Sequence, residues 1–361
     1  MKVLHIISSL ASGGAEVYVR DLSMQMVRSG HEVYIAYISD TASLGRSPTF
    51  QKEYQDALTH AGVRYVELGH GCRKAPWRGG ASLRRVALEF QPDVIHSHLY
   101  YGIFFKTFGF LNVPLVYTHH SSRLGKGKYL YRVLDKLVDR FVGISRDCAE
   151  ILKGAGASNV TVIYNGVDSD RLFLKTCWKA GREIRLVAVG TLRTPKNFSN
   201  LIEAIGLLCG QSHSFANRFS LQIAGEGPLK HELLRQIERE GLSEKVFLLG
   251  NREDIPDLLN KSDVFVLSSD WEGLPISLLE AMMTGLPVIV TDVGGCRDVV
   301  ELCNAGVVVP PGSAEALAQA LEQMIIDSKG RQEYGRNAKI GSQQFDISRA
   351  VEAHIALYKT L

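Results

Sequence analysis

Short apolar runs of strand length alternate with longer amphipathic stretches along all 361 residues, and the alternation starts afresh near the middle of the chain. The first series of apolar runs falls at residues 2–7, 32–37, 63–68, 94–96, 115–118, 138–144 and 160–163. The second series falls at residues 185–189, 220–224, 246–248, 264–267, 287–291 and 306–309. Buried parallel strands produce such runs, and connecting helices cover both faces of their sheet. The pattern therefore predicts two α/β domains, each a doubly wound, Rossmann-like sheet.

The positions of the two series predict the domain boundaries. The first domain covers residues 1–165, a linker spans 166–182, and the second domain covers 183–345. The last amphipathic segment, 346–361, predicts a helix that can pack on either domain, including back on the first. Open α/β sheets bind ligands beyond the carboxyl ends of their strands. If the two domains face each other, we expect the site in the cleft between them, lined by residues that follow strands.

The composition is that of a globular protein, with 45% hydrophobic and 22% charged residues. The apolar run near the start, residues 3–7, is too short for a signal peptide, and no stretch approaches the roughly eighteen apolar residues of a membrane-spanning helix. We therefore expect a cytoplasmic protein, with a peripheral position on the inner face of the membrane left open. The six scattered cysteines form no metal-ligand pattern and are expected to be reduced.

Positive charge is concentrated in the first half of the chain, although the net charge is only +3. Residues 73–140 hold 12 Lys and Arg against four Asp and Glu, a net of +8. Such a surface could bind an anionic membrane or an anionic acceptor, or it could be a set of ordinary solvated helix faces. We predict weak, salt-sensitive association with anionic lipid. No nucleic-acid-binding motif is present, so no nucleic acid partner is expected.

The segment with the clearest chemical pattern is Ser-Ser-Asp-Trp-Glu-Gly-Leu-Pro-Ile-Ser-Leu-Leu-Glu-Ala at residues 268–281. Gly273 permits a sharp turn after a strand, and Pro275 favours the first turn of a helix whose amides could receive phosphate. Glu272 then lies at the mouth of that helix. Glu280 lies inside it on an apolar stretch and needs a partner if buried. Ribose hydroxyls could supply that partner, and a buried cation is the alternative.

Two other loops that follow strands carry groups suited to anions. Gly13 and Gly14 open a helix and would let backbone N–H groups approach an anion, although a plain tight turn explains them equally well. Arg193 and Lys196 follow the first strand of the second domain. Together they suit a diphosphate, with Arg as a fork and Lys as a point charge, unless they are merely surface cations.

In these motifs and their order the chain resembles glycosyltransferase family 4, retaining enzymes of the GT-B fold, with two facing Rossmann-like domains and an interdomain cleft. The resemblance spans nearly the whole chain and is carried by Gly13-Gly14, Asn165-Gly166-Val167-Asp168, Arg193 with Lys196, Gly225-Glu226-Gly227-Pro228, Glu272-Gly273-x-Pro275 with Glu280-Ala281, and Gly294-Gly295.

The resemblance implies a role for each motif. The first domain would lie on the acceptor side, and the second would bind the donor. Glu280 would bind the ribose, and Glu272 would face the transferred sugar, with Gly273, Leu274 and Pro275 also contacting the donor. Arg193 and Lys196 would hold the diphosphate, with Gly13 and Gly14 lending amides. The family generally needs no divalent metal, so neither a metal nor a cofactor is expected.

Histidines after two strands of the first domain are the candidates for the acceptor side. Strand alternation places His119 and His120 on opposite faces, and the family's T-x-H pattern aligns on His120, which we favour for the donor sugar or the acceptor hydroxyl. His98 is the better acceptor-side candidate of the H-x-H pair, and His96 the better structural one.

The expected activity is retaining transfer of a hexose or N-acetylhexosamine from a nucleoside-diphosphate sugar to a hydroxyl of a glycan or lipid-linked acceptor. The setting would be surface polysaccharide synthesis, such as lipopolysaccharide or capsule. A UDP-sugar is favoured, and GDP-mannose stays open. A sugar-nucleotide isomerase or epimerase of the same fold, or a non-catalytic sugar-nucleotide-binding partner, are the alternatives. Loops at residues 39–54 and 69–80 are expected to set the specificity.

Overall fold

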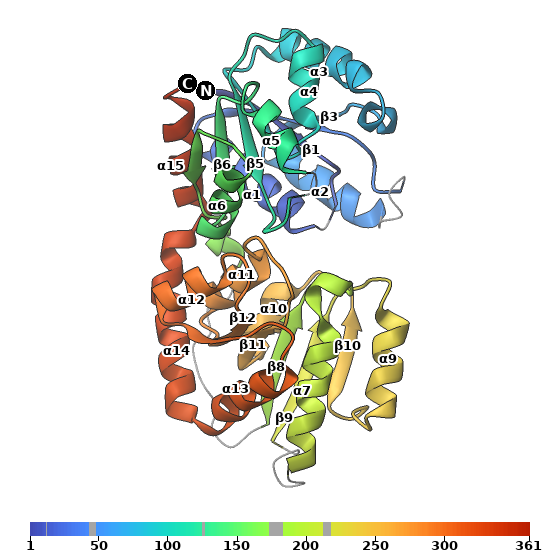
Figure 1. The fold of residues 1–361 in the computed structure, drawn as a ribbon, viewed down its shortest axis with the longest axis vertical. Coiled ribbons are helices and arrows are strands. Elements are labelled where there is room, and N and C mark those ends of the chain that lie inside the picture. Colours follow the sequence, from blue (N-terminus) through green and yellow to red (C-terminus); the bar gives the residue numbers. More distant parts are fainter. Residues whose placement is uncertain (12, 43–47, 125–126, 173–182, 212–217) are drawn as a thin grey trace. The chain divides into compact units, whose positions relative to one another are not determined.

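The structure is a computed structural model that describes residues 1–11, 13–42, 48–124, 127–172, 183–211 and 218–361. The chain forms two compact units (Figure 1). Unit 1 consists of Met1–Val167 together with Ile347–Leu361, and unit 2 of Asp168–Asp346. Residues 168–172 of the predicted linker thus belong to unit 2, and residues 173–182 lie outside the described residues.

Unit 1 contains a seven-stranded parallel sheet in the order β3-β2-β1-β4-β5-β6-β7. Its strands are β1 (Lys2–Ile7), β2 (Glu32–Tyr37), β3 (Arg64–Glu67), β4 (Val94–Ser97), β5 (Leu115–His119), β6 (Arg140–Gly143) and β7 (Val160–Val162). Its helices are α1 (Gly14–Arg28), α2 (Pro48–His60), η2 (His70–Arg73), α3 (Pro76–Phe90), α4 (Gly102–Phe108), α5 (Lys128–Leu134), α6 (Arg146–Gly154) and α15 (Ile347–Tyr358). All seven predicted strands form.

The two faces of this sheet differ in polarity, because successive side chains of a strand point to opposite sides. Leu4, Ile6 and Ile95 belong to an apolar core that also includes side chains of α3, α4 and α5. On the alternate positions, His5 and His96 are fully buried. The C-terminal helix α15 packs against α1 in unit 1.

Unit 2 contains a six-stranded parallel sheet in the order β10-β9-β8-β11-β12-β13. Its strands are β8 (Ile184–Val189), β9 (Phe219–Ala224), β10 (Val246–Gly250), β11 (Val264–Leu267), β12 (Val288–Thr291) and β13 (Gly306–Val309). Its helices are η3 (Ser169–Arg171), η4 (Thr194–Lys196), α7 (Phe198–Gln211), α9 (Lys230–Arg239), α10 (Ile255–Lys261), α11 (Ile276–Thr284), α12 (Cys296–Cys303), α13 (Ala314–Ile326), α14 (Ser328–Gly341) and η5 (Ser342–Phe345).

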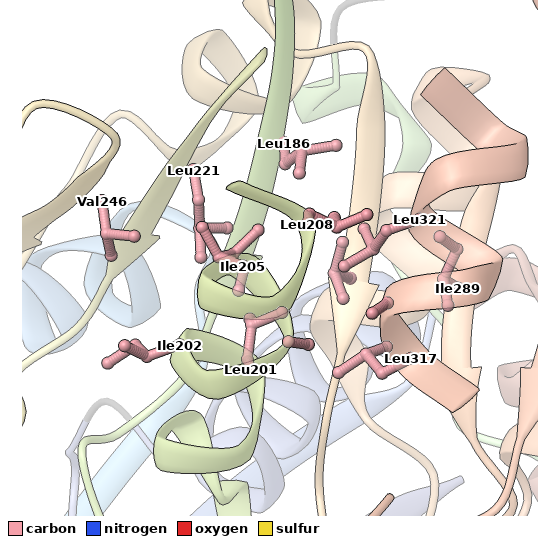
Figure 2. Close-up of a cluster of buried hydrophobic side chains, with 14 of the residues drawn as sticks. Leu186, Leu201, Ile202, Ile205, Leu208, Leu221, Val246, Ile289, Leu317 and Leu321 are labelled. Atoms are coloured by element: carbon pink, nitrogen blue, oxygen red, sulfur yellow. The ribbon is translucent and has the colours of Figure 1, made fainter. Parts of the chain in front are cut away.

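The core of unit 2 lies between this sheet and the neighbouring helices α7 and α13. Figure 2 shows Leu201 and Ile205 of α7 among the strand residues, with Leu317 and Leu321 contributed by α13. All four side chains are fully buried. The burial of such a layer provides most of the driving force for folding and holds the strand ends, from which the loops emerge, in a fixed register.

Both sheets reverse their strand order once, between β1 and β4 in unit 1 and between β8 and β11 in unit 2. At such a switch point the loops leave neighbouring strands in opposite directions and open a crevice at the carboxyl edge. The loops after β1, β4, β8 and β11 are therefore the ones that the fold places best for ligand binding.

The prediction of loops at residues 39–54 and 69–80 was wrong in part. Helix α2 begins at Pro48, η2 covers His70–Arg73, and α3 begins at Pro76. Prolines at helix starts were the available signal, because the first helical position needs no N–H donor. Among the described residues, no helix combines the length and apolar character needed to cross a membrane.

Candidate functional site

Two loops meet at the switch point of unit 2, and each contributes one member of an ion pair. Lys196 ends η4 after β8, and its Nζ donates to Oε1 of Glu272, in the loop after β11, at 2.5 Å. Ser269 donates its hydroxyl to the same oxygen at 2.7 Å. The side chains of Lys196 and Glu272 are only 18% and 13% exposed. The structure thus brings together two of the predicted site residues, 76 positions apart in sequence.

Further hydrogen bonds hold these two loops in one arrangement. Asn197 donates its side-chain amide to Asp270 at 2.8 Å, and the Asp270 N–H donates to the carbonyl of Pro195 at 2.9 Å. Ser268 donates its hydroxyl to the carbonyl of Lys196 at 3.0 Å. The position of the ammonium group is therefore set by the loop that carries the carboxylate. Sequence reasoning missed these supporting residues, although all lie beside the predicted ones.

The glycine loop after β12 packs directly on the backbone at Glu272. Gly294 has φ +54°, and a Cβ there would lie 2.2 Å from the carbonyl oxygen of Glu272 and 2.5 Å from that of Gly273. The Gly295 N–H donates to the Gly273 carbonyl at 2.7 Å. Only glycine allows so close an approach of two backbone segments, which explains why the sequence has glycine at this position.

The glycine loop after β9 packs in the same way on the loop after β8. Gly225 has φ +149°, and a Cβ there would lie 1.9 Å from the carbonyl oxygen of Gly190. A Cβ on Gly227 would lie 2.4 Å from the carbonyl oxygen of Leu192. Four of the motifs picked out in the sequence thus form one layer at the carboxyl edge of the unit 2 sheet.

Glu280 has a cationic partner within unit 2. The residue lies in α11, is 8% exposed, and accepts a hydrogen bond from Nη2 of Arg171 at 2.6 Å. The structure therefore shows the buried-cation partner that the sequence offered as the alternative to ribose. Arg171 was missed, because 109 residues separate it from Glu280 and no local spacing links the two. An ion pair to one oxygen does not test the predicted ribose contact.

The remaining predicted donor residues differ in their surroundings. Arg193 is exposed, and no ion pair to it is seen within the described parts of unit 2. Leu274 is 3% exposed, and Pro275 is the buried N-cap residue of α11. Arg193 is thus an accessible cation beside Lys196, whereas Leu274 and Pro275 fix the start of the helix.

In unit 1, Gly13 and Gly14 stand at the start of α1, with Gly13 as the N-cap residue, and the structure places this loop at the switch point. Glu16 folds back over this turn. Its Oε1 accepts a hydrogen bond from the Ser8 hydroxyl at 2.5 Å, and a Cβ on Gly13 would lie 2.2 Å from its Oε2. Sequence reasoning missed this carboxylate at the helix start. Binding of an anion by these amides stays a prediction.

The predicted acceptor-side histidines take different partners in unit 1. His98 contacts His120, with 2.8 Å between Nδ1 and Nε2, and also His5, with 3.1 Å between Nε2 and Nδ1. His119 instead contacts the Tyr117 hydroxyl through Nδ1 at 3.1 Å. Burial lowers the pKa of His120 to about 3 and of His119 to about 4, so both rings are neutral at pH 7. The sequence did not single out His5.

Family models match both halves of the chain. The Glycosyltransferase Family 4 model matches residues 12–171, and the Glycosyl transferases group 1 model matches residues 178–340. Together the two models account for most of the sequence.

Full-length relatives and solved structures are similar as well. The glycogen synthase of Mycobacterium tuberculosis is 26% identical over 91% of this chain and 86% of its own length. The GalNAc-α-(1→4)-GalNAc-α-(1→3)-diNAcBac-PP-undecaprenol α-1,4-N-acetyl-D-galactosaminyltransferase of Campylobacter jejuni is 26% identical over 99% of this chain and 98% of its own. Anabaena HepE, solved in complex with UDP-glucose, is 22% identical with a TM-score of 0.83 over 100% of both chains, which shows the fold. The chain therefore belongs to the glycosyltransferases of the GT-B fold, with a family 4 domain followed by a group 1 domain.

Proposed function

We propose that this glycosyltransferase moves a hexose or N-acetylhexosamine, with retention, from a nucleoside-diphosphate sugar to a hydroxyl of a glycan or lipid-linked acceptor. The setting would be surface polysaccharide synthesis. The ion pair between Lys196 and Glu272 at the switch point of unit 2 carries this proposal. A UDP-sugar is favoured, because Anabaena HepE shares the fold and binds UDP-glucose. The name of the Campylobacter jejuni relative supports a lipid-linked acceptor.

The chemistry would be a front-face substitution. The bond between the sugar C1 and the diphosphate oxygen breaks, the acceptor oxygen bonds to C1 from the same side, and the acceptor proton passes to the leaving diphosphate. Negative charge grows on that diphosphate, and Lys196, Arg193 and the amides at the start of α11 would stabilise it. Glu272 would face the sugar and hold Lys196 in place. With these cations available, the reaction needs neither a divalent metal nor a cofactor.

A panel of nucleotide sugars, each with and without candidate acceptors, tests this function by nucleotide release. We expect release to depend on one donor and to rise at least tenfold with a hydroxyl acceptor. An isomerase or epimerase would convert the donor without any acceptor. A non-catalytic binding partner would bind the donor in calorimetry and release nothing. Loss of the acceptor-dependent part in His120→Ala or His98→Ala would support the predicted acceptor-side roles.

Glu280→Gln tests the proposed ribose contact. A carboxylate that accepts hydrogen bonds from hydroxyls contributes about 1.5–3 kcal/mol, so we expect UDP to bind roughly 10- to 100-fold more weakly. Calorimetry with UDP measures the change. Because the substitution also breaks the ion pair with Arg171, Arg171→Met is the matched control and should weaken UDP binding much less. Equal losses in the two variants would mean that Glu280 acts through Arg171 and not on the ribose.

We further propose that unit 1 binds the anionic inner face of the cytoplasmic membrane through the basic region 73–140. Large aromatic side chains are exposed there, among them Trp77 at 60% and Phe110 at 84%. Trp77 belongs to α3, and Phe110 follows α4. These two helices pack against each other, and Arg84 of α3 donates to the carbonyl of Gly109 at 2.8 Å. Exposed aromatic rings among cations suit the boundary between lipid headgroups and acyl chains.

Phe110→Asn tests the membrane role with a substitution that is not expected to destabilise the fold. Phe110 has φ 51°, a left-handed conformation that costs a bulky residue about 1–2 kcal/mol and that asparagine tolerates better. We expect unchanged or higher stability, together with at least threefold weaker co-sedimentation with phosphatidylglycerol vesicles at low salt. Leu302→Asn, at a 57% exposed position of unit 2, is the control. If wild-type co-sedimentation is the same with purely zwitterionic vesicles, the proposal fails.

A further inference from the structure

Five histidines gather on one face of the unit 1 sheet. His5 and His96 are register partners on the neighbouring strands β1 and β4, and His98 lies two residues beyond His96 on the same face. The remaining two come from the end of β5 and from α15. Ring centroids of neighbours are 4.2–5.3 Å apart. We call this group the histidine cluster: His5, His96, His98, His120 and His354.

Three of these rings converge at the spacing of metal ligands. His5, His96 and His98 each offer a ring nitrogen, and the three nitrogens lie within 4.8 Å of one another. Nδ1 of His5 and Nε2 of His98 are 3.1 Å apart. A tetrahedral zinc ion with Zn–N bonds of about 2.0–2.1 Å separates its ligand nitrogens by about 3.3 Å. The His5–His98 pair therefore already has the separation that such an ion requires.

The surroundings keep the three rings in the form that binds metal. Their exposed fractions are 0%, 0% and 8% in the order His5, His96, His98. Burial disfavours a charged imidazolium at such positions, and metal sites need neutral histidine.

Hydrogen bonds on the far side of two of the rings would orient them as metal ligands. Nδ1 of His98 is hydrogen-bonded to Nε2 of His120 at 2.8 Å. His96 contacts the Tyr358 hydroxyl through Nδ1 and the Thr118 hydroxyl through Nε2, both at 2.6 Å. Whichever nitrogen of His96 turns to a metal, the other keeps a partner. Such second contacts fix the tautomer and orientation of histidine ligands.

The protein alone does not satisfy every ring nitrogen of the histidine cluster. Nε2 of His5, Nδ1 of His120 and Nδ1 of His354 are buried and have no hydrogen-bond partner. Buried polar atoms in native proteins nearly always have a partner, so a further small group is expected among these rings. Water molecules would partner these three nitrogens. The convergence of three imidazoles at His5, His96 and His98 is the separate observation that favours a metal ion, because imidazole is a preferred ligand of zinc and similar metals.

We propose that His5, His96 and His98 form a Zn²⁺ site that fastens β1 to β4 beneath α1 and α15. The fourth ligand would be a water molecule. Binding replaces the His5–His98 hydrogen bond and one of the two hydrogen bonds of His96, to the Tyr358 or the Thr118 hydroxyl. Each of the three rings keeps its single proton on the nitrogen that faces away from the metal, so no proton leaves the protein. The site is structural, since all three ligands lie in the interior of unit 1.

Metal titration of the full chain tests the site. Protein stripped with EDTA and desalted is titrated with Zn²⁺ by calorimetry and with Co²⁺ by visible absorption. We expect one equivalent to bind at micromolar concentration or below, a four-coordinate Co²⁺ spectrum, and a melting temperature raised by several degrees with Zn²⁺. His5→Gln should lose this equivalent. His231→Gln, at an exposed position of α9, should keep it.

If His5→Gln does not fold, X-ray absorption on zinc-loaded wild-type protein decides the question. Three imidazole shells at about 2.0 Å would support the site. No bound equivalent, an unchanged melting temperature, a coordination shell of solvent oxygens, or full binding by folded His5→Gln would each overturn it. The histidine cluster would then be a hydrogen-bonded network completed by water.

Discussion

Lys196→Met is expected to lower donor turnover by at least about 100-fold while unit 2 stays folded. The ammonium group of Lys196 lies 2.5 Å from Glu272 at the switch point. The Lys196 side chain is only 18% exposed, so solvent does not readily take over its role. Removing one preorganised donor from a developing oxyanion typically costs about 10²–10³ in kcat. Methionine is unbranched and only one heavy atom shorter than lysine, and it removes the ammonium group with its charge and its donors. Nucleotide release at saturating donor gives kcat, and thermal unfolding reports the fold.

Lys230→Met is the matched control, because Lys230 also forms a lysine–glutamate pair in unit 2, with Glu226 at 2.7 Å, but on the surface. Exposed pairs of this kind contribute little, so turnover should stay within about twofold of wild type. The double variant Lys196→Met with Glu272→Gln should be far less than additive, since the two side chains act as one unit. Full turnover in Lys196→Met would remove the main support for the proposed function.

Gly294→Ala is expected to destabilise unit 2 by about 2–4 kcal/mol and to reduce turnover at least tenfold. The added Cβ would lie 2.2 Å from the carbonyl oxygen of Glu272, and the positive φ of 54° strains any L side chain. The two backbone segments must separate, and the segment in contact with the new Cβ carries the Glu272 carboxylate. Denaturant unfolding and kcat measured on the same preparation check both parts.

Gly210→Ala provides the control for a glycine that has space. Gly210 lies near the end of α7, and a Cβ there meets nothing within 4 Å. The exchange should stabilise the helix by about 0.5–1 kcal/mol and leave turnover unchanged. Should Gly294→Ala keep wild-type kcat despite lower stability, the position of the Glu272 backbone would not matter for the reaction.

The strands could be predicted because each is a short apolar run bounded by turn residues, and several are buried along their whole length, as at Val264–Leu267 and Val288–Thr291. Lys196 and Glu272 could be predicted too, because both lie in loops that follow predicted strands and belong to motifs that resemble those of a known family. Their place where the sheet order reverses is known from the structure alone. Their direct contact agrees with the prediction that they share one site.

Contacts between distant segments could not be predicted. The pairing of Arg171 with Glu280 depends on how η3 folds against α11, which no local pattern encodes. His5 lies in the middle of an apolar strand, where a buried histidine looks the same in sequence whether it has metal-ligating neighbours or not. His354 and Tyr358, one helical turn apart on α15, meet the sheet only because the chain returns to unit 1.

That return makes unit 1 discontinuous in the order of synthesis. Residues 1–167 leave the ribosome first, yet α15, which supplies the hydroxyl of Tyr358 to His96, is made only after the whole of unit 2. Until then the histidine face of the first sheet lacks α15 and presents buried polar groups to water. Unit 2, a single continuous segment, can complete its core before unit 1 does. The nascent protein therefore finishes its second domain before its first.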